Sequence, residues 1–169
     1  MRCSLVLTLV IALFFTQTPT IKDVRANFFQ VCNKKKELSE WANELKEVEN
    51  DNYLIIAYKG VASAMFAEIA SGVYTKLKYF STGTKMLERV IAKYPDDIEL
   101  RFLRLTIQKN APSFLNYSGN IEADKDKIIK GLTDTERVKT DPFLNMKIVE
   151  YLSANNMCTK EELKLLKKE

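Results

Sequence analysis

The sequence predicts an all-α protein built from antiparallel helix pairs, and three observations support that fold class. The 169 residues include only five glycines and four prolines, the residues that interrupt helices most strongly. Hydrophobic residues make up 46% of the chain, enough for one domain with a core. These residues recur every three or four positions along most of the chain, which is the spacing of one face of a helix.

The first twenty residues have the layout of a secretory signal peptide. Arg2 supplies a positive charge, and the apolar run "LVLTLVIALFF" occupies Leu5 to Phe15. That run is too short to cross a bilayer as a permanent helix. We therefore expect residues 1–20 to be a signal peptide, with its cleavage position open. Residues 21–169 would form one exported helical domain, periplasmic or extracellular, without an integral membrane segment. The alternative is an N-terminal core helix.

Histidine is absent from the sequence, and this excludes several kinds of site. Ser-His-Asp and Cys-His catalytic arrangements and zinc sites with histidine ligands all need it. The three cysteines form no CxxC pair, so we expect no metal and no cofactor. In an exported chain Cys32 and Cys158 could form a disulfide. The interpretation we favour is that they are two small hydrophobic residues, each buried separately.

Three helices are predicted between residues 21 and 72, each from an apolar stripe with a break after it. The stripes are Ile21-Val24-Phe28-Val31, Leu38-Trp41-Leu45-Val48 and Leu54-Tyr58-Val61-Met65-Ile69. The breaks are Lys34 to Lys36, Glu49 to Asn52, and Gly72. Alanines in the third helix would let a neighbouring helix pack closely; they are Ala57, Ala62, Ala64 and Ala67.

A fourth helix is expected from about Thr75 to Lys93, closed by Tyr94 and Pro95. Its inward residues would be Leu77, Phe80, Leu87 and Val90. Two stripes align at an offset of 42 residues, Leu38-Trp41-Leu45-Val48 with Phe80-Gly83-Leu87-Val90. Repetition of helix pairs at this length is typical of an α-solenoid.

The fourth helix resembles the second helix of a tetratricopeptide repeat. That pattern places an aromatic, a small, a large apolar and a small apolar residue before a proline, as in Phe80, Gly83, Leu87, Val90 and Pro95. The resemblance implies that Gly83 is small because the partner helix backbone approaches it. Trp41 departs from the pattern in the earlier pair, so that repeat is degenerate or ends the stack.

A longer resemblance extends over about residues 57–132. "AYKGVASAMFAEIA", the segment from "KLKYF" to "SFLNY" and "NIEADKDKII" are similar to a family of uncharacterised exported helical proteins of bacteria with two membranes. This resemblance implies the TPR-like α-solenoid fold and export, and it implies no activity.

The C-terminal third carries clear helix-start signals. A fifth helix from Glu99 to Asn110 would end at Pro112, and Asn120 would cap a sixth as far as Lys130. Asp141 and Pro142 open a further helix, and Thr159 with Glu162 forms a capping box for the last one. The inward residues of the helix after Pro142 are expected to be Phe143, Met146, Val149 and Leu152.

The segment from Glu99 to Lys125 is the best candidate for a binding site. In one interpretation five side chains converge on a groove for an acidic peptide or anion: Arg101, Arg104, Tyr117, Asn120 and Lys125. In the other the arginines are structural and pair with Glu99, Asp96, Asp97 or loop carbonyl groups. The loop residues Phe114, Leu115 and Tyr117 would then pack onto the core.

These features favour an exported interaction or assembly module that binds a protein or peptide and is not an enzyme. The alternative is a protein that binds a small molecule or an anion. An enzyme would have to use a cluster such as Arg101, Tyr117, Asn120 and Asp124. The net charge of +4 predicts no nucleic-acid partner. The basic runs Lys34 to Lys36 and Lys164 to Lys168 are expected to be solvated surface or contacts to anionic lipid headgroups.

Overall fold

A computed structural model of the chain describes residues 19–49, 51–134 and 140–166. Every regular element in these residues is a helix, and they contain no strand, which confirms the predicted all-α class. The predicted signal peptide lies almost entirely outside the described residues, which begin at Pro19.

The N-terminal half contains four of the helices. They are α1 (Ile21–Cys32), α2 (Leu38–Glu47), α3 (Tyr53–Phe66) and α4 (Val73–Lys93). The described residues of the C-terminal half add a short 3₁₀ turn and four more helices. These are α5 (Ile98–Asn110), η1 (Ser113–Leu115), α6 (Ile121–Leu132), α8 (Pro142–Ala154) and α9 (Lys160–Leu166).

Side chains at the helix starts satisfy backbone N–H groups that have no partner within the helix. The Asp141 carboxylate accepts from the Leu144 N–H at 3.0 Å, and Pro142 occupies the first turn of α8, as predicted. Thr159 and Glu162 form the predicted capping box. Asn120 does occupy the N-cap position of α6, but its side chain makes no capping hydrogen bond, which corrects that prediction.

Helices α3 and α4 form an antiparallel hairpin whose backbones touch at two glycines. A Cβ atom on Gly60 would lie 2.8 Å from the Gly83 carbonyl oxygen. One on Gly83 would overlap the Gly60 carbonyl oxygen and the Ala64 backbone nitrogen. The prediction that Gly83 is small because a partner backbone approaches it is therefore confirmed.

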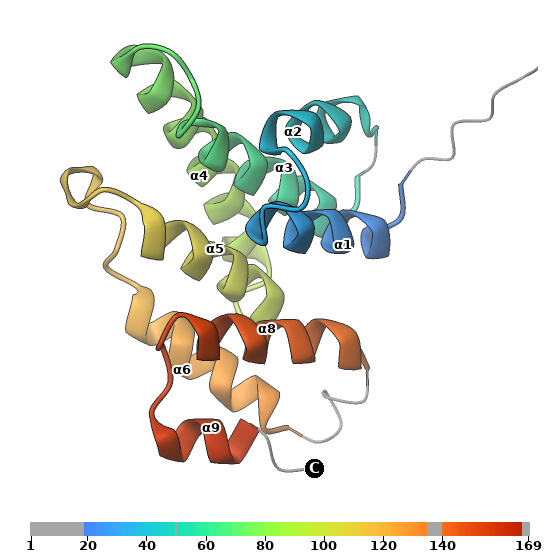
Figure 1. The fold of residues 1–169 in the computed structure, drawn as a ribbon, viewed down its shortest axis with the longest axis vertical. Helices are drawn as coiled ribbons and strands as arrows, with labels where there is room; N and C mark the ends of the chain where they lie inside the picture. Colours follow the sequence, from blue (N-terminus) through green and yellow to red (C-terminus); the bar gives the residue numbers. More distant parts are fainter. Residues whose placement is uncertain (1–18, 50, 135–139, 167–169) are drawn as a thin grey trace, which may run out of the picture.

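Helix α5 lies in the middle of the molecule, with α4, α3 and α2 toward the top of Figure 1 and α6, α8 and α9 toward the bottom. From Ile98 to Gln108, Arg101 is the one residue of this helix that is not fully buried. A helix that is covered on all sides cannot be amphipathic in the usual sense. Its charged residues must therefore find partners inside the protein, whereas the buried Gln108 amide has no hydrogen-bond partner among the described residues.

An aromatic cluster joins the N-terminal helices to α5 and α8. Phe28 of α1 contacts Trp41 of α2 and Tyr58 of α3, with ring centroids 5.8 and 5.5 Å apart. Phe102 of α5 contacts both Phe28 and Tyr151 of α8 edge-on. Four of these five rings are completely buried, so the cluster is the centre of the core.

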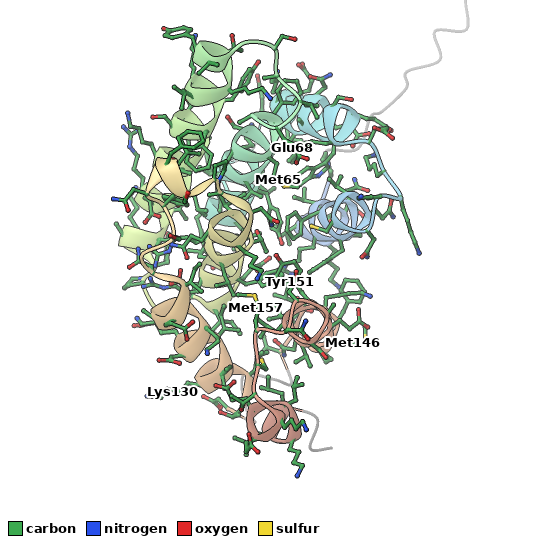
Figure 2. All side chains as sticks on the ribbon, turned by 60° about the vertical axis from the view of Figure 1, so that its left-hand side comes forward. Met65, Glu68, Lys130, Met146, Tyr151 and Met157 are labelled. Atoms are coloured by element: carbon green, nitrogen blue, oxygen red, sulfur yellow. The ribbon has the colours of Figure 1, made fainter. Side chains whose placement is uncertain are left out.

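The predicted inward face of α8 is correct at Leu152 and wrong at Phe143 and Met146. Phe143 and Met146 are each 48% exposed, and Met146 lies on the outer side of the helix in Figure 2. The buried face consists of Leu144, Asn145, Ile148 and the predicted Leu152, and the predicted Val149 is partly buried beside it. Apolar residues occupy two sides of this helix, so its sequence period does not determine which side faces the core.

Three other predicted core residues are also exposed. Leu77 lies on the part of α4 before its crossing with α3, and Ile69 lies in the turn beyond the end of α3, so neither is covered. Phe114 is 78% exposed, which contradicts its expected packing on the core. Tyr117 does pack inward, with its ring edge-on to Phe80 at 5.5 Å.

Cys32 and Cys158 are free cysteines, so the structure contains no disulfide between them. Both are partly buried beside the core. Burial raises the pKa of the Cys32 thiol to about 12, and it also raises that of Cys158. A thiol with so high a pKa is almost entirely protonated at neutral pH and reacts slowly.

Gly83→Ala is expected to lower the free energy of unfolding by about 3 kcal/mol, because its methyl group would overlap backbone atoms that cannot move independently. Without that overlap the change would stabilise the helix by about 1 kcal/mol, because alanine favours helix over glycine. Urea unfolding followed by circular dichroism measures the difference. The control is Gly119→Ala, where a Cβ would meet nothing within 4 Å. Equal stability of the two variants would contradict the close crossing.

Alkylation should find both Cys32 and Cys158 reduced. We expect iodoacetamide added to the unfolded chain without reductant to modify both residues, as read by peptide mass spectrometry. In the folded chain Cys32 should stay largely unmodified near pH 8 because of its raised pKa. A disulfide-linked peptide containing both residues would overturn this prediction.

Candidate functional site

Arg104 and Asp124 form the centre of the segment that the sequence singled out. Arg104 on α5 donates from Nε to Asp124 Oδ2 at 2.7 Å and from Nη2 to Oδ1 at 2.6 Å. This two-point geometry is the strongest form of an arginine–carboxylate pair. The Asp124 side chain, on α6, is completely buried, and the Arg104 side chain is 7% exposed. The pair therefore fixes α6 against α5 from inside.

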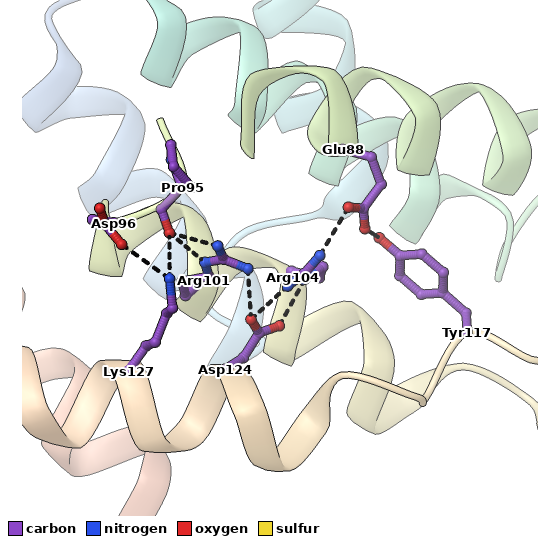
Figure 3. A network of polar contacts seen from close by, with 8 residues as sticks. All are labelled: Glu88, Pro95, Asp96, Arg101, Arg104, Tyr117, Asp124 and Lys127. Carbon is purple, nitrogen blue, oxygen red and sulfur yellow. Dashed lines mark hydrogen bonds and ion pairs between the residues drawn. The ribbon is translucent and has the colours of Figure 1, made fainter. Parts of the chain in front are cut away.

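The contacts of Arg104 continue to α4 and to the loop before α6 (Figure 3). Arg104 Nη1 lies 2.8 Å from Glu88 Oε2, and the Tyr117 hydroxyl donates to Glu88 Oε1 at 2.6 Å. Burial, together with this hydrogen bond, raises the pKa of Tyr117 well above its ordinary value. Tyr117 is thus held as a neutral hydrogen-bond donor, and its geometry is not that of a catalytic base.

Arg101 binds the turn between α4 and α5. Its Nε and Nη2 atoms both donate to the Pro95 carbonyl oxygen, the first at 2.9 Å. A third contact runs from Nη1 to Asp124 at 3.2 Å. Lys127 of α6 donates to the same carbonyl at 3.2 Å and pairs with Asp96 at 2.9 Å. The expected contact of an arginine with a loop carbonyl group is therefore found, at Pro95. The carboxylate partner of Arg101 is Asp124, and not Glu99, Asp96 or Asp97 as expected.

The remaining two predicted site residues do not join this network. Asn120 is exposed at the start of α6. Lys125 pairs with Glu122, three residues earlier on the same helix, at 2.8 Å. The donors of Arg101 and Arg104 are committed to internal acceptors, and Asp124 is enclosed. None of these residues lines the groove described below.

A second network of buried charges lies at the N-terminal end of α5. Arg25 of α1 donates from Nε to Glu99 at 2.6 Å and from Nη1 to Asp141, the cap of α8, at 2.7 Å. The Tyr58 hydroxyl of α3 donates to the same Glu99 carboxylate at 2.9 Å. Burial raises the pKa of Glu99 and that of Tyr58. Three helices, α1, α3 and α5, therefore meet at the Glu99 carboxylate, and Arg25 also links this group to the start of α8.

A groove with a volume of about 570 Å³ lies between α2, α3 and α4. Its base includes small and apolar residues of α2 and α3: Ala42, Leu45, Ala62, Ser63 and Phe66. Its other wall is α4, which contributes Tyr74, Thr75, Tyr79, Thr82 and Met86. The small residues on the base let an occupant approach α3 closely.

Three lysines line the groove, one from each helix, and no acidic residue among the described part of the chain does so. The Lys59 ammonium group donates to the Val48 carbonyl oxygen at the end of α2. That of Lys46 lies over the Phe66 ring, 5.9 Å from its centroid. Lys78 is exposed and has no ion pair with a described residue. The groove therefore combines an apolar base with a positive lining.

Sequence reasoning missed this groove, although a signal for it is present. Lys59, Ala62, Ser63 and Phe66 share one face of α3 at a spacing of three and four residues. The alanines of that helix were interpreted only as positions of close packing, which is correct for Ala64 at the crossing with α4. Ala62 lines the groove instead. Predicting this from the sequence would require knowing where α2 ends relative to α3.

Compared with known proteins, the chain matches no family model, and no curated protein and no solved structure is significantly similar to it. None of the helices within the described residues is both long and apolar enough to cross a bilayer. The same residues contain no group of three histidine, cysteine, aspartate or glutamate side chains placed to hold a metal ion.

Arg104→Met is expected to lower the free energy of unfolding by about 3 kcal/mol, because it leaves the buried Asp124 carboxylate with one long contact from Arg101. Arg101→Met should lower the free energy of unfolding by about 1 kcal/mol, because the stronger pair between Arg104 and Asp124 remains. Chemical unfolding of both variants gives the comparison.

Two further variants separate charge from packing in that experiment. Lys127→Met removes an exposed cation from the same network and should change stability by less than about 0.5 kcal/mol. Replacing both partners, as in Arg104→Met with Asp124→Leu, should recover part of the loss because no charge stays buried alone. If Arg104→Met and Lys127→Met have the same free energy of unfolding, the buried pair between Arg104 and Asp124 does not stabilise the packing of α6.

Proposed function

We propose that this is an exported, non-enzymatic binding protein whose partner occupies the groove between α2, α3 and α4. The observation that supports the proposal most directly is the lining of the groove, with apolar side chains at its base and three lysines around them. Such a surface favours a partner that is apolar on one side and negatively charged beside it.

The form of the groove supports binding rather than catalysis. The groove is lined by hydroxyl groups of Ser63 on α3 and of four residues on α4, Tyr74, Thr75, Tyr79 and Thr82. The Ser63 hydroxyl donates to the Tyr79 carbonyl oxygen. No carboxylate, thiol or imidazole of the described residues lines it, so the histidine-assisted nucleophiles of common hydrolases have no counterpart there, and the Lys59 ammonium group is bound to the Val48 carbonyl oxygen.

The leading form of the proposal is an interaction or assembly module of the TPR-like type in the periplasm. The apolar run from Leu5 to Phe15 supports export. The α3–α4 hairpin, with its backbone contact at Gly60 and Gly83, supports a repeat of this kind. Helix α8 packs on α5 through Tyr151 and Phe102, so that side of the stack is covered. The open groove on α3 is therefore the better surface for a partner.

A second candidate is a protein that binds a small anionic ligand. The groove volume of about 570 Å³ favours it, because sites for small molecules range from roughly 300 to 1,000 Å³. Both candidates use the same surface and the same lysines.

The groove can be tested before any partner is known, with the anionic aromatic dye anilinonaphthalene sulfonate. We expect the folded chain to bind the dye. Thr82→Phe should weaken binding at least about tenfold, because Thr82 is exposed in the wall and a phenyl ring would fill the groove. Dye fluorescence titrated against protein gives the dissociation constant.

The matched control is Ala92→Phe, an exposed position on the same helix that does not line the groove. It adds the same ring and should leave dye binding unchanged. Near-ultraviolet circular dichroism of both variants checks that the core is intact. Equal dye binding by the two variants would show that the dye, and by inference a partner, does not use the groove.

A further inference from the structure

We infer that the partner in the groove is an acidic amphipathic helix of two to three turns, supplied by another protein. This inference rests on the proposed function and names the chemistry of the occupant. It follows from the length of the groove, the distribution of its cations and the size of the side chains at its base.

The groove is as long as a short helix. Its lining residues on α3 run from Lys59 to Phe66, seven positions apart, and those on α4 from Tyr74 to Met86, twelve positions apart. At 1.5 Å per residue these spans are about 10 and 18 Å, the length of two to three helical turns. A segment of that length presents apolar side chains at positions i, i+3, i+4 and i+7 to one groove.

The cations lie toward both ends of this length. Lys59 reaches back to Val48 at the C-terminal end of α2, while Lys46 extends over Phe66, seven residues further along α3. Lys78 adds an exposed cation from the opposite wall. An acyl chain carries one charged group and would match one end only. Carboxylates spaced along a helix match both ends, and none of the described residues that line the groove is acidic and would compete with them.

The base of the groove is suited to receive a helix. Ala42, Ala62 and Ser63 have small side chains, so leucine-sized residues of an incoming helix can enter between α2 and α4 above α3. This is the arrangement in which an amphipathic helix lays its apolar face in a groove between other helices. The acidic helix α2 of a second copy could not serve, because it buries its own apolar residues Trp41 and Leu45.

The test uses two synthetic peptides of about 15 residues with the same apolar face of leucine and alanine. One has glutamates on the flanks of that face and the other has lysines. Each is labelled with a fluorophore, and binding to the full chain is measured by anisotropy. We expect the acidic peptide to bind, the basic peptide not to bind, and about 0.5 M NaCl to weaken the acidic complex at least tenfold.

A charge exchange makes the result specific to the groove. Lys46→Glu combined with Lys78→Glu should abolish binding of the acidic peptide and allow binding of the basic one, while Thr82→Phe should abolish both. Lys130→Glu is the control, since Lys130 is an exposed residue of α6 far from α3 in Figure 2. It should leave the acidic peptide bound as tightly as before.

The other outcomes separate this inference from the proposed function. If dodecanoate binds and Thr82→Phe abolishes it while neither peptide binds, the groove is a ligand site and the helix inference is wrong. If both peptides bind equally, or the charge exchange has no effect, the lysines do not select the partner and the inference is also wrong. If the peptides, dodecanoate and the naphthalene dye all fail to bind, the proposed function fails with it.

Discussion

Helix α5 lies in the interior of the protein, and a charged side chain on an interior helix must have a partner of opposite charge. Two such side chains determine how the other helices are placed. Glu99, near its N-terminal end, binds Arg25 of α1, and Arg104, one and a half turns further on, binds Asp124 of α6. A misplaced neighbour would leave a charge buried alone, at a cost of about 3 to 5 kcal/mol. The two pairs therefore favour one arrangement among the many that apolar packing alone would allow.

The position of α4, and with it the groove, depends on the same constraint. Glu88 ties α4 to Arg104 on one side, and the contact between Gly60 and Gly83 holds it against α3 on the other. With α4 fixed in this way, Thr82 and Met86 face α2 across α3 and form a wall. Buried structural charges and the surface lysines thus have separate roles, the first in placing the helices and the second in setting the potential of the space between them.

Local features of this fold were predictable from sequence, and relations between helices were not. The caps at Asp141 and Thr159 and the small residue Gly83 follow from short-range chemistry, and the structure has them. The two arginines were correctly seen as a pair on one face of a helix, yet Asp124 could not be identified as their partner, because its place depends on the turn before α6. The groove was missed for the same reason: its lining comes from three helices whose separation no periodicity encodes. Apolar residues on two sides of α8 likewise made its buried face ambiguous.

The contact between Arg25 and Asp141 has a kinetic consequence, since these residues are 116 positions apart in the chain. Glu99, the other acceptor of Arg25, is 74 positions away. The α3–α4 hairpin needs only neighbouring segments and can close early, whereas loops of this length close late and at a greater entropic cost. A chain that emerges N-terminus first therefore presents α1 long before the start of α8 is available to it. Docking of the first helix is then a late step, which completes the native state only when almost the whole polypeptide has been released.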